Sequence, residues 1–419
     1  MSLRESSGSR PAWASRRVLV AGAAAVALAA AAATALATTS HRATSHGATA
    51  EHGVSDHAAT KSARLAASSC TGPAGAAYIA LPGYQAFDAI NTANCDLVQQ
   101  YNVGDPQVPG DSGDYNYSSS EQGITVADNT LYFGDTGNDT VAVMPIGTLT
   151  VSNYANPAET LIQVGIDPTN LTVTPDGSQL WVADTGPQTG QTGSADGHQG
   201  GRHSGQSAAT DIKVIDTATN AVTKTLPLRS APAEIAFSPD GSTAYVTTAA
   251  GLVIYSTATD HVTGFVPGLG DPHGIVVSPD GSTLYVTSTI GGKVDVISTA
   301  TDQVTATITV GELPWGEALS SDGSTLYVAN PDSNSVSVIS TSSDAVTGTI
   351  SVPGDPDTLA LTPDGSELWV GGLTSGIVTV FDTSDNSSVG SFNVGYGGYP
   401  NAGDGELPTG IVMTTTPAP

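Results

Sequence analysis

The sequence is poor in cysteine, in large aromatic residues and, beyond its first 65 residues, in positive charge. It has two cysteines, six phenylalanines and four tryptophans in 419 residues. After residue 65 there are five basic residues against 36 aspartates and glutamates. A surface with this charge repels phosphate backbones, so we expect no binding to nucleic acid. No phosphate-binding loop, zinc-ligand spacing or nucleophile motif is present either.

Only the N-terminal stretch is apolar enough to cross a membrane. Arginines at 16 and 17 precede an apolar run from Val18 to Ala33, and small residues follow at 35–37. This layout is typical of a secretory signal peptide with a twin-arginine pattern, although the same stretch could remain as a membrane anchor. We interpret residues 1–37 as the signal peptide and residues 38–69, rich in Ala, Thr, Ser and His, as a disordered linker. Bacterial export to the medium or cell surface is expected.

The two cysteines lie at the start of the region that follows. An even number of cysteines in an exported protein indicates a disulfide, so we predict a bond between Cys70 and Cys95. Two free thiols or a metal pair are alternatives, but no His or Cys lies nearby at ligand spacing.

A ten-residue stretch recurs along the rest of the chain. "SPDGSTLYVT" begins at Ser278, and close copies begin at Thr174, Ser238, Ser320 and Thr362. The last four Asp-Gly turns are separated by 40, 42 and 42 residues. The wider gap before them contains residues 185–209, a Gly/Gln/Ser-rich stretch that we interpret as a flexible loop insertion. Such regular spacing indicates repeated units of one architecture.

Each unit of about 40 residues contains four alternating apolar stretches joined by tight turns, which predicts a small antiparallel sheet. Seven second strands can be counted, starting at Ala77, Leu131, Leu180, Ala244, Leu284, Leu326 and Leu368. The first unit lacks its first strand, and "LPTGIVMTTTP" from Leu407 supplies that pattern at the other end of the chain. We therefore predict an all-β, seven-bladed β-propeller over residues 70–419, closed by a C-terminal strand that completes the first blade.

The stretch "SPDGSTLYVTS…GKVDVISTATDQVTATITVG" resembles the YVTN-type repeat of bacterial and archaeal surface-layer and secreted propellers. The resemblance covers residues 77–414 and is strongest in the last four units. It implies an extracellular propeller used for binding or for organising the cell surface, and it brings no catalytic motif. Similarity to lactonase-type and streptogramin-lyase-type propellers extends to the fold and the Asp-Gly turns, and fold alone does not imply their chemistry.

The first strands, aligned at the residue after their proline, indicate which side chains meet near the axis. At that position Gln122, His273, Trp315 and Asp357 are candidate binding residues, and Glu234 follows at the next position. Glu317 replaces the apolar residue of other units, so it must be hydrated, paired or neutral. These residues could form a cluster for acid–base chemistry, cation binding or stacking of a sugar ring. The alternative is a water-filled channel lined by assorted polar side chains.

Two turns carry oxygen atoms at spacings that suit Ca²⁺: "DTGND", with Asp135 and Asp139, and "NPDSNS", with Asp332. Both are also ordinary turn sequences, so we expect no required cofactor, with calcium as the candidate ion.

The residues favour a binding or scaffold protein outside the cell, a monomer that recognises a protein or a carbohydrate. The alternative is an extracellular hydrolase or lyase that opens a lactone or cyclic ester, with His273 and Glu317 or Glu234 as catalytic residues. An enzyme would need His273 and an acid within hydrogen-bond reach in a pocket. A third interpretation, a surface-layer component, predicts self-assembly.

Overall fold

The protein is described by a computed structural model over residues 75–81, 86–102, 123–135, 139–146, 160–165, 168–185, 210–394 and 408–415. The chain divides into two units, residues 1–60 and 61–419, and all the described residues belong to the second. The predicted signal peptide and linker, Gln122, Cys70 and all of the 185–209 insertion except Thr185 lie outside the described residues. Within the described ranges, no helix has the length and hydropathy needed to span a membrane.

The described residues contain 28 strands in seven antiparallel sheets of four. From the axis outward, blade 1 consists of β28 (Gly410–Thr414), β1 (Ala76–Leu81), β2 (Ala86–Asn91) and β3 (Asp96–Asn102). Blade 2 consists of β4 (Ile124–Ala127), β5 (Thr130–Asp135), β6 (Thr140–Pro145) and β7 (Thr160–Gln163). Blade 3 consists of β8 (Pro168–Val173), β9 (Gln179–Asp184), β10 (Asp211–Asp216) and β11 (Ala221–Pro227).

The remaining four blades follow the same order. Blade 4 consists of β12 (Pro232–Phe237), β13 (Thr243–Thr248), β14 (Gly251–Ser256) and β15 (His261–Pro267). Blade 5 consists of β16 (Pro272–Val277), β17 (Thr283–Ser288), β18 (Lys293–Ser298) and β19 (Gln303–Thr309). Blade 6 consists of β20 (Glu317–Leu319), β21 (Thr325–Asn330), a 3₁₀ turn η3 (Pro331–Ser333), β22 (Ser335–Ser340) and β23 (Ala345–Ser351). Blade 7 consists of β24 (Pro356–Leu361), β25 (Glu367–Gly372), β26 (Ile377–Asp382) and β27 (Ser388–Asn393).

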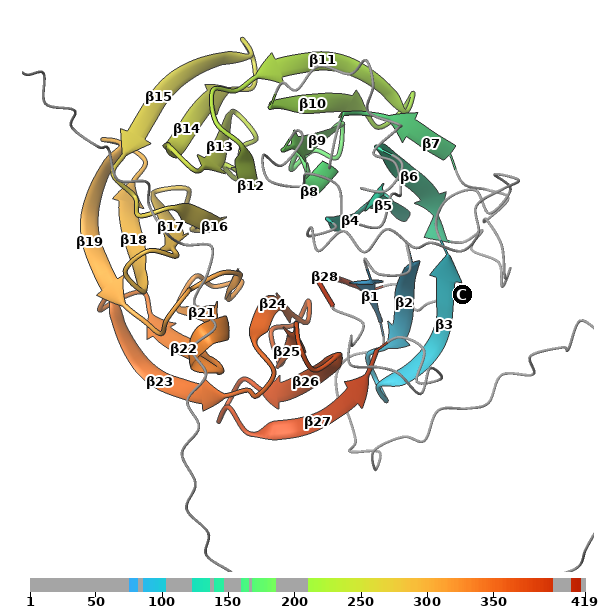
Figure 1. The fold of residues 1–419 in the computed structure, drawn as a ribbon, viewed down its shortest axis with the longest axis vertical. Helices are drawn as coiled ribbons and strands as arrows, with labels where there is room; N and C mark the ends of the chain where they lie inside the picture. Colours follow the sequence, from blue (N-terminus) through green and yellow to red (C-terminus); the bar gives the residue numbers. More distant parts are fainter. Residues whose placement is uncertain are drawn as a thin grey trace, which may run out of the picture. The chain divides into compact units, whose positions relative to one another are not determined.

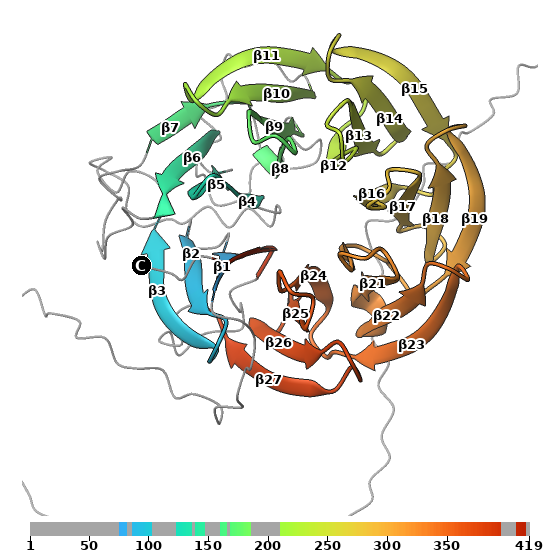
Figure 2. The ribbon, with the colours of Figure 1, turned by 180° about the vertical axis from the view of Figure 1, so that it is seen from behind.

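The blades form a ring, with the first strands around the axis and the fourth strands at the rim (Figures 1 and 2). The C-terminal strand β28 pairs antiparallel with β1, and Ile411 lies opposite Ile79. The last strand therefore completes the first blade, which removes the open edge of that sheet. The predicted seven-bladed, all-β propeller and its closure by the C-terminal strand are both confirmed.

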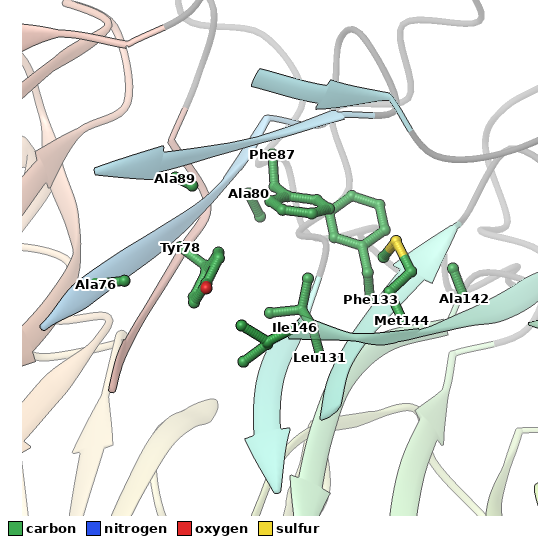
Figure 3. Close-up of a cluster of buried hydrophobic side chains, with 10 residues drawn as sticks. All are labelled: Ala76, Tyr78, Ala80, Phe87, Ala89, Leu131, Phe133, Ala142, Met144 and Ile146. Carbon is green, nitrogen blue, oxygen red and sulfur yellow. The ribbon is translucent and has the colours of Figure 1, made fainter. Parts of the chain in front are cut away.

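The core lies between neighbouring blades. In β17, residues on both faces of the strand are buried, because a blade covers each side. Figure 3 shows one such contact, where Phe87 of blade 1 faces Phe133 of blade 2, with ring centroids 6.1 Å apart. Burying one large apolar side chain contributes about 1.5–3 kcal/mol, so the clusters between blades stabilise the ring strongly.

The recurring ten residues hold one blade to the next through their turns. In blade 5, Asp280 Oδ1 accepts hydrogen bonds from Ser278 Oγ (2.6 Å) and Ser282 N (3.0 Å), and these bonds lower the pKa of Asp280 to about 2. Gly281 has a φ of 71°, which glycine adopts at little cost. The Pro279 ring packs against the turn of blade 6, where a Cβ on Gly323 would lie 2.8 Å from Pro279 Cδ. The repetition therefore preserves an intra-blade turn and an inter-blade contact.

Candidate functional site

The candidate residues come from four consecutive blades. Glu234 lies in β12 of blade 4, His273 in β16 of blade 5 and Asp357 in β24 of blade 7. Glu317 is the first residue of β20 in blade 6, and Trp315 precedes it in the chain. All therefore lie where the first strands enter the ring, as the alignment at the prolines predicts.

His273 and Trp315 form a stacked pair. Their ring centroids are 3.7 Å apart and their planes make an angle of 28°. Both residues are partly exposed, so the pair presents an aromatic surface at the axis end of blades 5 and 6. Stacking of this kind restricts the orientations of both rings. We call this pair the aromatic platform.

Glu317 packs against the backbone of β16. A Cβ on Gly274 would overlap the Oε2 atom of Glu317, so the carboxyl occupies the space that a side chain at 274 would fill. Both carboxyl oxygens are buried and have no hydrogen-bond partner. Burial raises the pKa of Glu317 well above its ordinary value of 4.5, and the charge of Glu234 raises it further. The nearby Thr287 hydroxyl lowers the pKa of Glu317, although its hydrogen is donated to the Trp315 carbonyl.

The junctions between blades explain why Glu317 stands where other blades have an apolar residue. Between blades 3 and 4, Asn170 Oδ1 accepts the backbone N–H of Ile235 at 3.3 Å. Between blades 4 and 5, Glu234 Oε2 accepts the backbone N–H of Ile275 at 3.3 Å. Each side chain therefore projects from the earlier blade onto the later one.

The next junction reverses this arrangement. Blade 5 has Gly274 at the position of Glu234, so the earlier blade offers no side chain to the junction. The carboxyl of Glu317, from the later blade, lies over that glycine instead. As a result two carboxyl groups, those of Glu234 and Glu317, flank the same two residues of β16. This pairing is the like-charge contact that raises the pKa of Glu317.

Two threonines that the sequence analysis did not single out bridge these junctions. Thr247 Oγ1 donates to the His273 carbonyl (2.5 Å) and accepts from Glu234 N (2.9 Å). Thr287 Oγ1 donates to the Trp315 carbonyl (2.8 Å) and accepts from Gly274 N (2.7 Å). The signal was visible in the repeat, because other second strands carry alanine or glycine at this position, as at Ala329.

The segment that carries Trp315 differs from its equivalents in other blades. In blades 4, 5 and 7 the first strand begins at the proline, whereas β20 begins three residues after Pro314 and contains only three residues. Leu313, just before that proline, has a φ of 55°, a conformation that Asp271 and Asp355 share at the same place in blades 5 and 7, so the difference lies in the residue type. A branched apolar residue rarely adopts this left-handed conformation, and backbone strain of this kind tends to gather at functional sites.

Asp357 joins the site through its backbone. Its carbonyl accepts the N–H of Gly316 at 3.2 Å, and a Cβ on Gly316 would overlap that carbonyl oxygen. Asp357 is buried, with 6% of its surface exposed. It therefore fixes the far side of the Trp315 segment through its backbone, and its role in binding stays a prediction.

One oxygen atom in each of the two turns considered for calcium accepts hydrogen bonds from backbone N–H groups. Asn334 Oδ1 accepts from Gly354 N (2.8 Å) and Asp355 N (3.1 Å), in the turn that contains Asp332. The Asp139 carbonyl accepts from Val164 N at 3.1 Å. In the described parts of the chain, no group of three or more His, Cys, Asp or Glu residues is arranged to hold a metal ion. The same turn as Asp139 begins at Asp135, the last residue of β5.

Cys95 is disulfide-bonded, and its predicted partner Cys70 lies outside the described residues. Two cavities of about 380 and 320 Å³ lie near the short β4–β5 turn of blade 2. The larger is lined by β4, by Asp128 and by the β8–β9 turn around Asp176, and the smaller by residues of β28 and Pro363. Neither is lined by the aromatic platform or by Glu317, which lie at the other ends of the first strands.

Comparison with known proteins supports a propeller family. A family model described as "Lactonase, 7-bladed beta-propeller" matches residues 261–392, about a third of the chain. This range contains His273, Trp315 and Glu317 but not Glu234. No curated protein matches the sequence.

Solved structures are similar in fold. A functionally unknown protein from Desulfotomaculum acetoxidans is 15% identical, with a TM-score of 0.59 over 82% of this chain and 99% of that one. The hydrazine synthase of Kuenenia stuttgartiensis is 19% identical, with a TM-score of 0.54 over 71% of this chain and 95% of that one. Dihydro-heme d1 dehydrogenase NirN, in complex with DHE, is 12% identical, with a TM-score of 0.56 over 82% and 75% of the two chains. At these identities the likeness concerns the fold alone.

Proposed function

We propose that the protein is an exported, monomeric propeller of the YVTN-repeat type that binds a small molecule or the end of a carbohydrate on the aromatic platform. The observation that carries the proposal is the stacking of His273 on Trp315, at a position where no other blade has an aromatic residue. Aromatic faces bind sugar and other rings, and partly exposed rings on a rigid scaffold are suited to recognition. Neighbouring acids supply polar contacts, because Glu234 lies beside the platform on β12.

The leader-like N terminus and the acidic composition support a location outside the cell. The apolar run after Arg16–Arg17 is typical of an export signal, and the net charge of −27 keeps an extracellular protein soluble.

A thermal-shift screen tests this proposal. Wild-type protein is heated with a panel of mono- and oligosaccharides and small ring compounds, and Trp315→Ala and His273→Ala are measured in parallel. Phe265→Ala is the matched control, because Phe265 is a 48% exposed aromatic residue on the rim strand β15. A compound that raises the Tm of wild type and Phe265→Ala, but of neither platform variant, supports binding at the platform. Compounds whose shifts survive Trp315→Ala would place binding elsewhere and contradict the proposal.

A second candidate function is hydrolysis of a lactone, favoured by the partial match to the lactonase family over residues 261–392. Burial favours the neutral form of Glu317, whereas Glu234 accepts a backbone N–H, which favours a carboxylate. A neutral Glu317 could supply a proton as the acid, with His273 as the base. Base uptake in a pH-stat with five- and six-membered lactones measures turnover. Loss of turnover in both His273→Ala and Glu317→Gln would establish the enzyme, and equal rates in all variants would exclude this site.

A further inference from the structure

The platform depends on a residue that is not on its surface. Glu317 follows Trp315 by two residues, and its carboxyl is seated on Gly274, the residue next to His273. The same carboxyl therefore touches the strand that carries one ring and belongs to the segment that carries the other. The carboxyl thus lies between the two segments whose spacing sets the distance between the rings.

We propose that Glu317 is the positioning residue of the aromatic platform, and that the platform forms only while the Glu317 carboxyl is neutral and seated on Gly274. This inference rests on the proposed function only in what it says about ligand affinity. The arrangement of the rings is a property of the protein alone.

The space over Gly274 that the Glu317 carboxyl fills accommodates a neutral group better than a charged one. Both carboxyl oxygens are buried without a hydrogen-bond partner, and a buried charge without a partner is strongly unfavourable. The Trp315 segment is bonded mainly on its own side of the junction: the N–H groups of Trp315 and Gly316 donate to the carbonyls of Ala329 and Asp357, in blades 6 and 7, and the Thr287 hydroxyl of blade 5 donates to the Trp315 carbonyl. Ionisation of Glu317 would therefore be relieved by moving the segment, and Trp315 with it, away from β16.

The titratable groups around the Glu317 carboxyl determine how its ionisation depends on pH. Glu234 on β12 is the acid whose charge acts on Glu317, His273 lies on β16, and Asp357 on β24 contacts Gly316 through its carbonyl. A negative charge at Glu234 opposes a second one at Glu317, so the neutral carboxyl persists above its ordinary range. Protonation of His273 would change the same pair of rings, and the test must separate these two titrations.

The fluorescence of Trp315 reports on the platform without any ligand. A stacked imidazole alters indole emission, and Trp181 and Trp369 are fully buried in other blades, so they give a constant background. Emission is recorded from pH 4.5 to 9 for wild type, Glu317→Gln, His273→Asn and Trp315→Phe, with far-UV circular dichroism to verify folding. The difference between wild type and Trp315→Phe isolates the Trp315 signal.

We expect a transition in the wild-type Trp315 signal that is lost in Glu317→Gln and retained, with altered amplitude, in His273→Asn. Glu317→Ile, which introduces the residue found at Ile275 and Ile235, serves if the glutamine variant does not fold. A transition that persists in the folded Glu317 variant, or the absence of a transition in wild type, would overturn the inference. Because no ligand is used, failure here is distinct from failure of the binding screen. Where a ligand is found, its affinity should fall at least threefold across the same pH range in wild type only.

Discussion

Replacing Glu317 should reveal the cost of burying its carboxyl. In wild type the unfolded chain ionises above the ordinary pKa of 4.5, whereas burial and Glu234 keep the folded carboxyl neutral to a higher pH. The folded state therefore holds a proton that the unfolded state has lost. Stability conferred by the neutral carboxyl is complete below pH 4.5 and declines as the pH rises, until the folded group also ionises.

The size of the effect follows from linkage. Each pKa unit separating the folded and unfolded states costs about 1.4 kcal/mol once both have ionised, and this is also the steepest loss per pH unit. Glu317→Gln has no such dependence, so its free energy of unfolding relative to wild type should rise steadily above pH 4.5. Glu317→Ile should add about 1.5–3 kcal/mol at every pH by burying an apolar side chain on Gly274.

Guanidinium denaturation at pH 4.5, 6, 7 and 8 measures these differences, with Glu312→Gln as control. Glu312 is an exposed acid of the same segment, so its variant should follow wild type within 0.5 kcal/mol or so at every pH. Parallel curves for wild type and Glu317→Gln would refute the reasoning. A glutamine variant that loses stability more at pH 8 than at pH 4.5 would show that Glu317 is a stabilising carboxylate.

Three further perturbations test the ring and its turns. The turn hydrogen bonds lower the pKa of Asp280 to about 2, so the stability they confer above the ordinary value of 3.8 should be lost as the pH falls towards 2. Asp280→Asn should therefore flatten the acidic part of a curve of Tm against pH. An unchanged slope in this variant would contradict the prediction. Gly274→Ala should lower the free energy of unfolding by about 1–3 kcal/mol in denaturant titration, because its Cβ would overlap Glu317 and lie 2.6 Å from the Trp315 carbonyl oxygen. An unchanged free energy would mean that the Glu317 carboxyl is not tightly packed on Gly274. Trp369→Ala should cost about 3–5 kcal/mol, since its side chain is fully buried between blades 7 and 1, and a loss below 1 kcal/mol would contradict that packing.

The fold could be predicted from the sequence because its signals are local and repeated. Alternation recurs in all seven units, and the Asp-Gly turns, spaced by 40–42 residues in the last four, mark the boundaries of the most regular blades. The incomplete first unit and the strand-like C terminus predicted the pairing of β28 with β1. Even irregular blade 2, whose turn lacks Pro-Asp-Gly, was counted correctly from "LYFGD".

The site could be predicted only as a set of positions. Alignment at the prolines placed His273, Trp315, Glu234 and Glu317 near one another, but not which side chains touch. Stacking of His273 on Trp315 depends on the path of residues 311–316, where β20 is truncated, and no repeat pattern specifies that path. The expectation for Asp357 missed its burial for the same reason.

The sequence predicted part of the environment of Glu317 but not its contact. Its occurrence in an apolar slot predicted a hydrated, paired or neutral carboxyl. Only the structure shows that the Glu317 carboxyl lies over Gly274, one position before it in the alignment of adjacent blades. The signal that could have identified the contact is the combination of a glycine, Gly274, in one blade with an acid in an apolar position, Glu317, in the next blade.

The most direct test of this account is a crystal structure of residues 70–419 at pH 6, at a resolution that separates the two C–O bond lengths of Glu317. The account predicts unequal bonds, as in a neutral carboxyl, with the group seated on Gly274 and Trp315 stacked on His273. Equal bonds, with the carboxylate extended towards the axis and Trp315 turned away from His273, would contradict it.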